Sequence, residues 1–218
     1  MNSKIEFKYQ RYEALAKVSK VFASARRLEI VDALIQQPAS VEGIAQHIHQ
    51  SVANTSQHLQ VLKRAKVVQT QREGTTIIYR LTDGMMPLFV ALRQFAEQTS
   101  PELQILKQET HTVPLIDFAT VQQKLQNPRT LLLDVRSEEE FACNHMKGAV
   151  NIPSKQIPAR LEELNSAQEI IVTCRGPYCV SSIEITQYLL KNHFRVFRYD
   201  DGIGEWQAQG GMLIQQSS

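Results

Sequence analysis

Residues 51–81 read SVANTSQHLQVLKRAKVVQTQREGTTIIYRL, and the spacing of their hydrophobic residues changes from a helical period to a strand period. Ser51 is a favourable N-cap, so a helix is expected over residues 51–65. Its inner face is expected to carry Val52, Leu59 and Leu62. Beyond this helix apolar and polar residues alternate, which predicts a β-hairpin over residues 67–81 that turns at Glu73-Gly74.

Further helices are expected on both sides of this stretch. Residues 9–22, 28–35 and 41–49 carry apolar side chains at three- and four-residue spacing, with Ser40 as the N-cap of the third helix. Residues 85–98 predict a fifth helix by the same pattern. Two short helices joined by a tight link and followed by a basic hairpin are typical of the winged helix-turn-helix, whose second helix enters the major groove of DNA.

In this arrangement the outward positions of the helix over residues 51–65 would reach base edges, because their side chains are short or amide-bearing. Basic residues at the end of that helix and in the hairpin would contact phosphates. The candidate DNA-contacting residues are Ser51, Ala53, Asn54, Gln57, His58, Lys63, Arg64 and Arg72. An ordinary helical bundle with a solvated polar face would show the same pattern, and this alternative stays open here.

The charge distribution favours the DNA-binding interpretation. The 218-residue chain has a formal net charge of +2, but residues 1–100 hold 13 Lys and Arg against 8 Asp and Glu, whereas residues 101–218 hold 11 against 14. A basic half is expected to meet a polyanion. The 43% hydrophobic content excludes a disordered or collagen-like chain. Neither a bilayer-spanning apolar stretch nor a secretory leader is visible, so a cytoplasmic protein without a membrane partner is expected.

The chain is expected to form two domains. Residues 99–114 lack a sustained period and contain two prolines, which predicts a linker between a mainly α-helical domain over residues 1–98 and a second domain over residues 115–218. In the second domain strands and helices alternate, and this order predicts an α/β domain with a parallel sheet flanked by helices. The expected strands are 130–135, 170–174 and 196–199, and the expected helices are 121–126, 157–164 and 180–191.

Cys174 ends one of these strands, and Arg175-Gly-Pro-Tyr-Cys separates it from the next helix. A thiol in such a loop has converging backbone N–H groups, a helix N-terminus and Arg175 beside it. We therefore expect a stabilised thiolate that acts as a nucleophile. The same N–H groups would hold the negative charge of a persulfide. A buried, inert cysteine at a strand end is the alternative.

Residues 10–98 resemble the ArsR/SmtB family of dimeric bacterial repressors. The resemblance rests on FASARRLEIV (22–31), SVANTSQHLQVLK (51–63) and REGTTIIYRL (72–81). It implies that the first and last helices pair across a two-fold axis, so that a homodimer binds near-palindromic double-stranded operator DNA. The apolar faces of those helices are equally compatible with a core within one chain.

The ligand sets of the metal-sensing members of that family are missing from this domain. The helix before the recognition helix offers His47 and His49, whose two-residue spacing points them to different sides, so solvated or capping histidines are expected. No metal and no cofactor are expected. The persulfide sensors of that family use two cysteines in this domain, and this domain holds none. The signal is therefore expected to arrive from outside it.

Residues 115–215 resemble a rhodanese domain, a sulfurtransferase module. The matching motifs are LLLDVR (131–136), EFACNHMKGAVNIP (140–153), the Cys174 loop and DGIGEW (201–206). The resemblance implies that Cys174 accepts sulfane sulfur from a small donor, becomes a persulfide and passes the outer sulfur to a thiol acceptor. It implies a structural charge pair between Asp134 and Arg136. It assigns the active-site loop to Arg175, Gly176, Pro177, Tyr178, Cys179 and Val180.

The chain departs from the common rhodanese pattern at Asn144, at Asp201 and at the sixth loop position, where Cys179 replaces a frequent Arg. A second thiol there would attack a Cys174 persulfide, close a disulfide and release sulfide. The loss of positive charge would favour thiol-based persulfide donors over thiosulfate. Alternatively, Cys179 packs as a small apolar residue. Cys143 is expected to be an unpaired loop cysteine.

Two functions fit these observations. The first is a homodimeric transcriptional regulator in which the sulfur state of Cys174 changes the affinity for operator DNA. The second is a sulfurtransferase enzyme whose N-terminal domain serves only for dimerisation or docking. Brisk sulfur transfer from thiosulfate to cyanide without salt-dependent DNA binding would favour the second.

Overall fold

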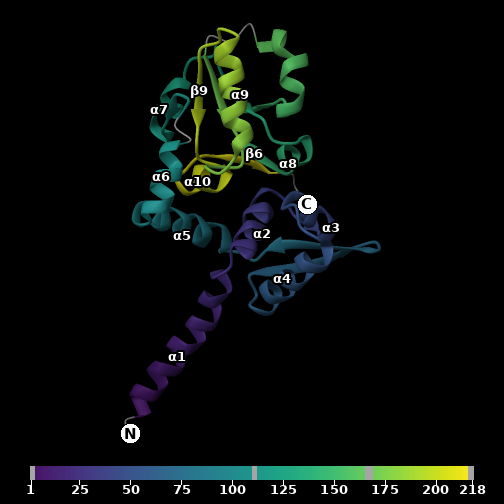
Figure 1. Ribbon diagram of the computed structural model, residues 1–218, viewed down its shortest axis with the longest axis vertical. Coiled ribbons are helices and arrows are strands. Elements are labelled where there is room, and N and C mark those ends of the chain that lie inside the picture. Colours follow the sequence, from purple (N-terminus) through teal and green to yellow (C-terminus); the bar gives the residue numbers. More distant parts are fainter. Residues whose placement is uncertain (1–2, 110–111, 165–168, 216–218) are drawn as a thin grey trace. The chain divides into compact units, whose positions relative to one another are not determined.

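A computed structural model describes residues 3–109, 112–164 and 169–215 of the chain. The chain separates into two compact units, Met1–Phe89 and Val90–Ser218 (Figure 1). Helix α5 (Met85–Thr99) runs across this boundary, so the division lies within the last helix expected for the first domain and not after it. Residues 110 and 111 of the expected linker, and both outer ends of the expected domains, lie outside the described residues.

The first unit is mainly helical and carries a small antiparallel sheet with the strand order β1-β3-β2. Helices α2, α3 and α4 contact one another, and α2 and α3 also contact β3. The helical segments are α1 (Ser3–Ser19), η1 (Lys20–Phe22), α2 (Ala25–Gln36), α3 (Val41–His47) and α4 (Val52–Arg64), and the strands are β1 (Ala39–Ser40), β2 (Val68–Glu73) and β3 (Thr76–Leu81). This is the expected winged helix-turn-helix arrangement.

Local hydrogen bonds explain where these elements begin. The Ser40 side chain accepts a hydrogen bond of 3.2 Å from the Gly43 backbone N–H at the start of α3, and the Ser51 side chain accepts one of 3.2 Å from Asn54 at the start of α4. Gly74, with φ of 59°, turns the hairpin between β2 and β3. Both expected caps and the expected hairpin are confirmed.

The buried face of α4 differs from the expected one at Val52. That side chain is 45% exposed, whereas Thr55, Leu59 and Leu62 are buried. Seven residues at about 100° bring Val52 to within roughly 20° of Leu59 around the helix axis, but Val52 is the first residue of α4 and lies about 10 Å from Leu59 along that axis, at the end of the helix. The expectation for Val52 was therefore wrong.

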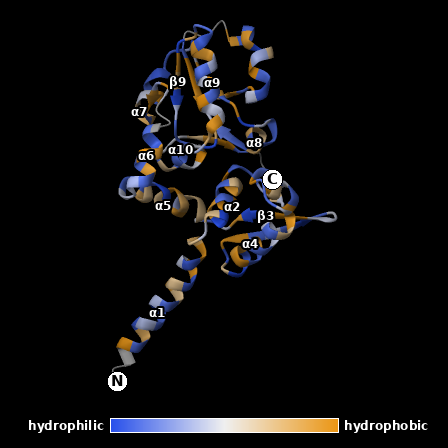
Figure 2. Ribbon diagram, viewed as in Figure 1, coloured by the Kyte–Doolittle hydropathy of each residue, from blue (hydrophilic) through white to orange (hydrophobic). Residues whose placement is uncertain are grey.

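Helix α1 contributes few contacts to the core of its unit. Hydrophilic and hydrophobic residues alternate irregularly along it (Figure 2). Its described apolar side chains are exposed, namely Ile5, Phe7, Tyr9, Tyr12, Leu15 and Val18. On α5, Phe89 is buried, but Leu88, Leu92 and Phe95 are exposed. These exposed stripes are therefore not used as a core within the chain.

The second unit is built on a parallel five-stranded sheet with the strand order β4-β9-β8-β5-β7. A two-stranded antiparallel sheet joins β6 to β10. The strands are β4 (Leu115–Ile116), β5 (Thr130–Asp134), β6 (Asn144–Met146), β7 (Val150–Asn151), β8 (Glu169–Thr173), β9 (Val196–Tyr199) and β10 (Leu213–Gln215). The helices are α6 (Pro101–Glu109), α7 (Phe118–Lys124), α8 (Glu138–Cys143), α9 (Val180–Lys191) and α10 (Ile203–Ala208).

Alternate residues of the central strands supply two hydrophobic cores, one on each face of the sheet. Leu133 of β5 and Val172 of β8 belong to the core that includes Ile185 of α9. Leu132 and Ile171, the next residues toward the N-terminus, belong to the core that contains Val121 of α7, Tyr199 and Trp206. The expected parallel α/β sheet flanked by helices is confirmed.

Two segments of this unit differ from the expected elements. Residues 157–164 form no single helix but lie in two short 3-10 segments, η2 (Ser154–Ala159) and η3 (Leu161–Leu164), because Pro158 cannot donate the hydrogen bond that a continuous helix needs. The expected linker contains α6, whose first residue is Pro101 and whose Leu103 N–H donates to the Ser100 side chain over 3.3 Å. Within the described residues, no helix is long and apolar enough to span a bilayer.

Candidate functional site

The loop after β8 holds two of the three cysteines. All five residues of β8 are buried, so Cys174 emerges from the middle of the sheet, next to the start of α9. Cys179 is the N-cap residue of α9. The side chains are joined in a disulfide with a Cα–Cα distance of 6.4 Å, and Cys174 and Cys179 are only 2% and 9% exposed. The loop fold therefore lets the second thiol reach the first.

Two glycines allow the close packing of this loop. Gly176 has φ of 138°, and its carbonyl accepts a hydrogen bond of 3.0 Å from the Cys179 N–H. Gly202 lies against the loop from the start of α10, and a Cβ on it would lie 2.2 Å from the Arg175 carbonyl oxygen. Any side chain at residue 202 would therefore push the loop away.

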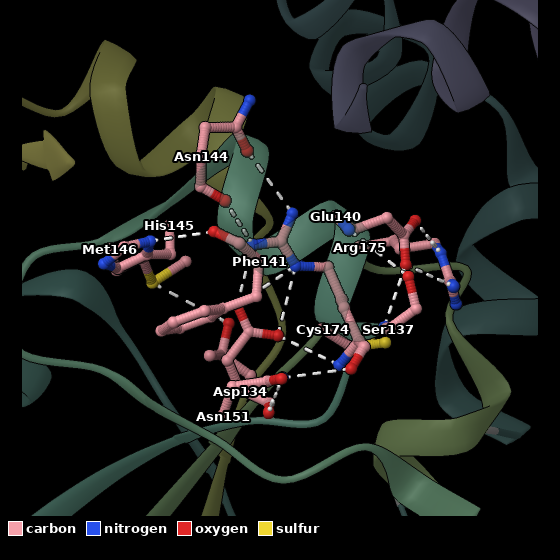
Figure 3. A network of polar contacts seen from close by, with 12 residues as sticks. Asp134, Ser137, Glu140, Phe141, Asn144, His145, Met146, Asn151, Cys174 and Arg175 are labelled. Atoms are coloured by element: carbon pink, nitrogen blue, oxygen red, sulfur yellow. Dashed lines mark hydrogen bonds and ion pairs between the residues drawn. The ribbon is translucent and has the colours of Figure 1, made fainter. Parts of the chain in front are cut away.

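Arg175 is bound to a carboxylate. Its Nε and Nη2 donate to Glu140 Oε1 and Oε2 at 2.7 and 2.6 Å (Figure 3). Glu140 also closes a capping box at the start of α8, where its side chain accepts from Ser137 N–H and its own N–H donates to Ser137 Oγ. Burial opposes ionisation of Glu140, but the hydrogen bonds and charge of Arg175, with the Ser137 N–H, hold the pKa of that carboxyl below its ordinary value. The guanidinium expected to stabilise the Cys174 thiolate therefore has a carboxylate partner.

Asp134 and Arg136 form the expected charge pair, fully buried, with Arg136 Nη2 at 2.7 Å from Asp134 Oδ2. The same guanidinium donates to the backbone carbonyl of Asn144 over 2.7 Å, and Asn151 donates to the carbonyls of Asp134 and Arg136. These contacts join the ends of β5, β6 and β7 (Figure 3). The pair holds strands together and lies within the scaffold.

A second buried arginine supports the loop from β9. Arg198 donates from Nε to Ser182 Oγ over 2.9 Å and from Nη2 to the Pro177 carbonyl over 3.3 Å, and it forms an ion pair with Asp200. Ser182 in turn donates to the Cys179 carbonyl over 2.9 Å. Burial lowers the pKa of Arg198 from its ordinary value, although the Asp200 charge opposes that shift.

Cys143, at the end of α8, is a free thiol of intermediate exposure. Burial raises the pKa of this thiol above its ordinary value, although the charge of Arg136 opposes the shift. A raised pKa leaves less of the reactive thiolate at neutral pH.

On the first unit, the candidate DNA-contacting side chains share the outer surface of α4 and the wing. Seven of them are exposed and His58 is of intermediate exposure. The Arg72 Nε donates to the Gly74 carbonyl over 3.1 Å at the tip of the wing. His47 and His49 are exposed, and no group of three or more His, Cys, Asp or Glu side chains in the described part of the chain is placed to hold a metal ion.

Comparison with known proteins also divides the chain into an N-terminal and a C-terminal part. Residues 24–70 match the family described as bacterial regulatory protein, arsR family, and residues 117–209 match the rhodanese-like domain. The chain is 32% identical over 201 residues to the HTH-type transcriptional regulator Rv0324 of Mycobacterium tuberculosis, a match that covers 91% of this chain and 89% of that protein. The chain belongs to the ArsR-family HTH-type transcriptional regulators that carry a rhodanese-like domain.

Other relatives match one part of this regulator. A sulfurtransferase of Allochromatium vinosum is 28% identical over 101 residues, which cover 45% of this chain and 92% of that protein. A homodimeric winged helix-turn-helix DNA-binding domain from Mycobacterium bovis, Mb0332, is 32% identical, with a TM-score of 0.41 over 44% of this chain and 89% of that structure. The resemblance of the two parts to the ArsR family and to rhodaneses is confirmed.

Two site residues of the regulator could not be found by local reasoning. Glu140 opens the motif over residues 140–153, but its partner Arg175 is 35 residues away in the chain, so no local pattern pairs them. Arg198 interrupts the apolar strand β9, and a charged residue in a central strand was the one available signal.

Proposed function

We propose that this ArsR-family regulator binds near-palindromic operator DNA as a homodimer and that sulfane sulfur on Cys174 changes its affinity for that DNA. The observation that carries the sulfur chemistry is the bond between Cys174 and Cys179. A loop in which the two sulfur atoms bond has the geometry to resolve a persulfide on the first cysteine with the thiol of the second.

The chemistry needs only a small persulfide donor, R–S–SH. The Cys174 thiolate attacks the outer sulfur of the donor, R–S⁻ leaves, and Cys174 carries a persulfide. The Cys179 thiolate then attacks the inner sulfur of that persulfide, which forms the Cys174–Cys179 disulfide and releases HS⁻. The donor is the oxidant in this sequence. A thiol reductant that is itself oxidised to a disulfide restores both thiols.

The charges around the loop favour a thiol-based donor over the thiosulfate dianion. Arg175 and Arg198 each form an ion pair with a carboxylate, Glu140 and Asp200 respectively. Their positive charges are therefore largely compensated, and Cys179 replaces the further cation that rhodaneses often carry in the loop. A neutral or singly charged persulfide needs less compensation than a dianion.

The DNA-binding part rests on the exposed residues of α4 and the wing, and on the exposed apolar side chains of α1 and α5. A second copy would bury those apolar side chains, and the two recognition helices of such a homodimer would then reach successive major-groove faces. Lys63, Arg64 and Arg72 would contact phosphates, whereas Ala53, Asn54 and the other outward residues would read bases.

The test combines mass spectrometry with operator affinity measured on the intergenic DNA upstream of the gene. After treatment with a glutathione persulfide, the wild-type protein should form the Cys174–Cys179 disulfide and change its Kd. Cys179→Ser should instead accumulate one added sulfur on Cys174, and Cys174→Ser should respond in neither assay. Cys143→Ser is the matched control and should behave as wild type.

Equal operator affinities for reduced protein, treated protein and Cys174→Ser would contradict the sulfur-dependent regulation. Brisk thiosulfate-to-cyanide transfer without salt-dependent DNA binding would instead assign the chain to the sulfurtransferase enzymes.

A further inference from the structure

Arg93 of helix α5 packs against the cysteine loop within the second unit. It is only 7% exposed and forms an ion pair with Glu205. Its guanidinium carbon lies 5.7 Å from the centre of the Tyr178 ring. A Cβ built on Gly176 would lie 3.5 Å from both Nη1 and Nη2 of Arg93. Two residues between the cysteines therefore lie beside this side chain.

Glu205 ties the same arginine to the other side of the loop. While one oxygen of Glu205 pairs with Arg93, the other accepts a hydrogen bond of 3.1 Å from the Gly202 N–H at the start of α10. Gly202 packs closely on the Arg175 carbonyl, because a Cβ built on it would lie 2.2 Å from that oxygen. The Arg175-Gly176 backbone is thus held between the Arg93 guanidinium and the first residues of α10.

The outer side of the loop has room to move. A cavity of about 400 Å³ is lined by Pro177 and Tyr178 of the loop and by Leu103 and Leu106 of α6. The Tyr178 side chain is 56% exposed. A displacement of Tyr178 into this cavity would meet little resistance, whereas a displacement of Gly176 would meet the buried Arg93.

We propose that Arg93 is a positioning residue that connects the state of the Cys174–Cys179 pair to helix α5. When the disulfide is reduced or Cys174 carries a persulfide, the two sulfur atoms separate from bonding distance to van der Waals contact. Gly176 and Tyr178 lie between them in the chain: Gly176 shifts against Arg93, whereas Tyr178 moves toward the cavity. Because α5 is one continuous helix, the shift reaches the buried Phe89, about one turn from Arg93.

This inference rests on the proposed function only in its output, the operator affinity. The link from the loop to α5 is a separate property of the protein, and it is measurable without DNA. Arginine is suited to the link because its rigid planar group holds the carboxylate, the ring and the glycine at once, which the single ammonium of a lysine does not.

The experiment uses the full-length chain, with Arg93→Met combined with Glu205→Gln. This pair leaves no uncompensated buried charge, and the glutamine retains an oxygen for the Gly202 N–H. Arg195→Met is the control, because Arg195 is a largely exposed arginine of the same unit that also pairs with a glutamate. Hydrogen–deuterium exchange of α5 and operator Kd are measured for the disulfide form and after reduction with a dithiol, which is itself oxidised to a cyclic disulfide.

In wild type and Arg195→Met, reduction should change amide exchange in α5 at least threefold. In the double variant the two forms should exchange equally, although mass spectrometry still shows the Cys174–Cys179 disulfide and the unfolding temperature confirms the fold. The single variant Arg93→Lys should keep less than half of the wild-type difference. A full exchange difference in the double variant, or no difference in wild type, overturns the role of Arg93. A wild-type exchange difference with equal operator Kd values supports the link and overturns the proposed function.

Discussion

The substitution Gly202→Ala tests the close approach of α10 to the cysteine loop. The new Cβ would lie 2.2 Å from the Arg175 carbonyl oxygen, and an ordinary C···O contact is about 3.3 Å, so the two backbones must separate by about 1 Å. Overpacking of this size costs about 1–3 kcal/mol. For a unit the size of Val90–Ser218 we expect the unfolding temperature to fall by roughly 4–12 °C.

Fluorescence of Trp206 is a direct assay of this effect. It is the only tryptophan of the chain, and it is buried in the second unit against Phe118 and Tyr199. Gly210→Ala is the control, because Gly210 has φ of 87° but open space around it, so the substitution adds about 1 kcal/mol of backbone strain without a collision. A Gly202→Ala protein whose unfolding temperature falls by less than about 4 °C would refute the reasoning.

Four further substitutions test the acid response, the DNA contacts and the dimer. The pKa of Glu140 is held below its ordinary value, so its ionised form stabilises the second unit above about pH 4.5, and this stability is lost as the pH falls through the folded pKa. In urea titrations, Glu140→Gln should lower the free energy of unfolding at neutral pH by about 1–3 kcal/mol. The variant should also lose less stability than wild type as the pH falls. An unchanged dependence of stability on pH would contradict this. Arg72→Ala should lower the slope of log K against log salt concentration for operator binding by about 1. Asn54→Ala should weaken the free energy of operator binding by about 1–3 kcal/mol and change binding to unrelated DNA little. Equal losses on both DNAs would refute base reading by Asn54. Phe95→Glu should shift sedimentation toward the monomer, and a sedimentation coefficient identical to that of wild type would exclude Phe95 from the dimer interface.

Local signals in the sequence were sufficient for much of the secondary structure. The serines at residues 40 and 51 cap their helices because a hydroxyl three residues upstream of a free N–H needs no distant partner. The hairpin turn at Gly74 and the buried strand before Cys174 follow equally from short-range period and composition. Pro101 predicted an interruption, but it is the first residue of α6, because proline fits the first helical turn as well as it fits a linker.

The motifs around Cys174 and in α4 also showed, from the sequence by itself, that the chain pairs an ArsR-type helix-turn-helix with a rhodanese-like domain. Only the tertiary structure showed which charges oppose one another around the loop. Arg175 meets Glu140 across 35 residues of chain, and Arg93 meets Glu205 across 112. Such pairs depend on strand order and helix placement, and no local period or cap records them. Local preferences act over one helical turn or strand pair, whereas the partners of a buried charge are set by how the whole chain closes around it.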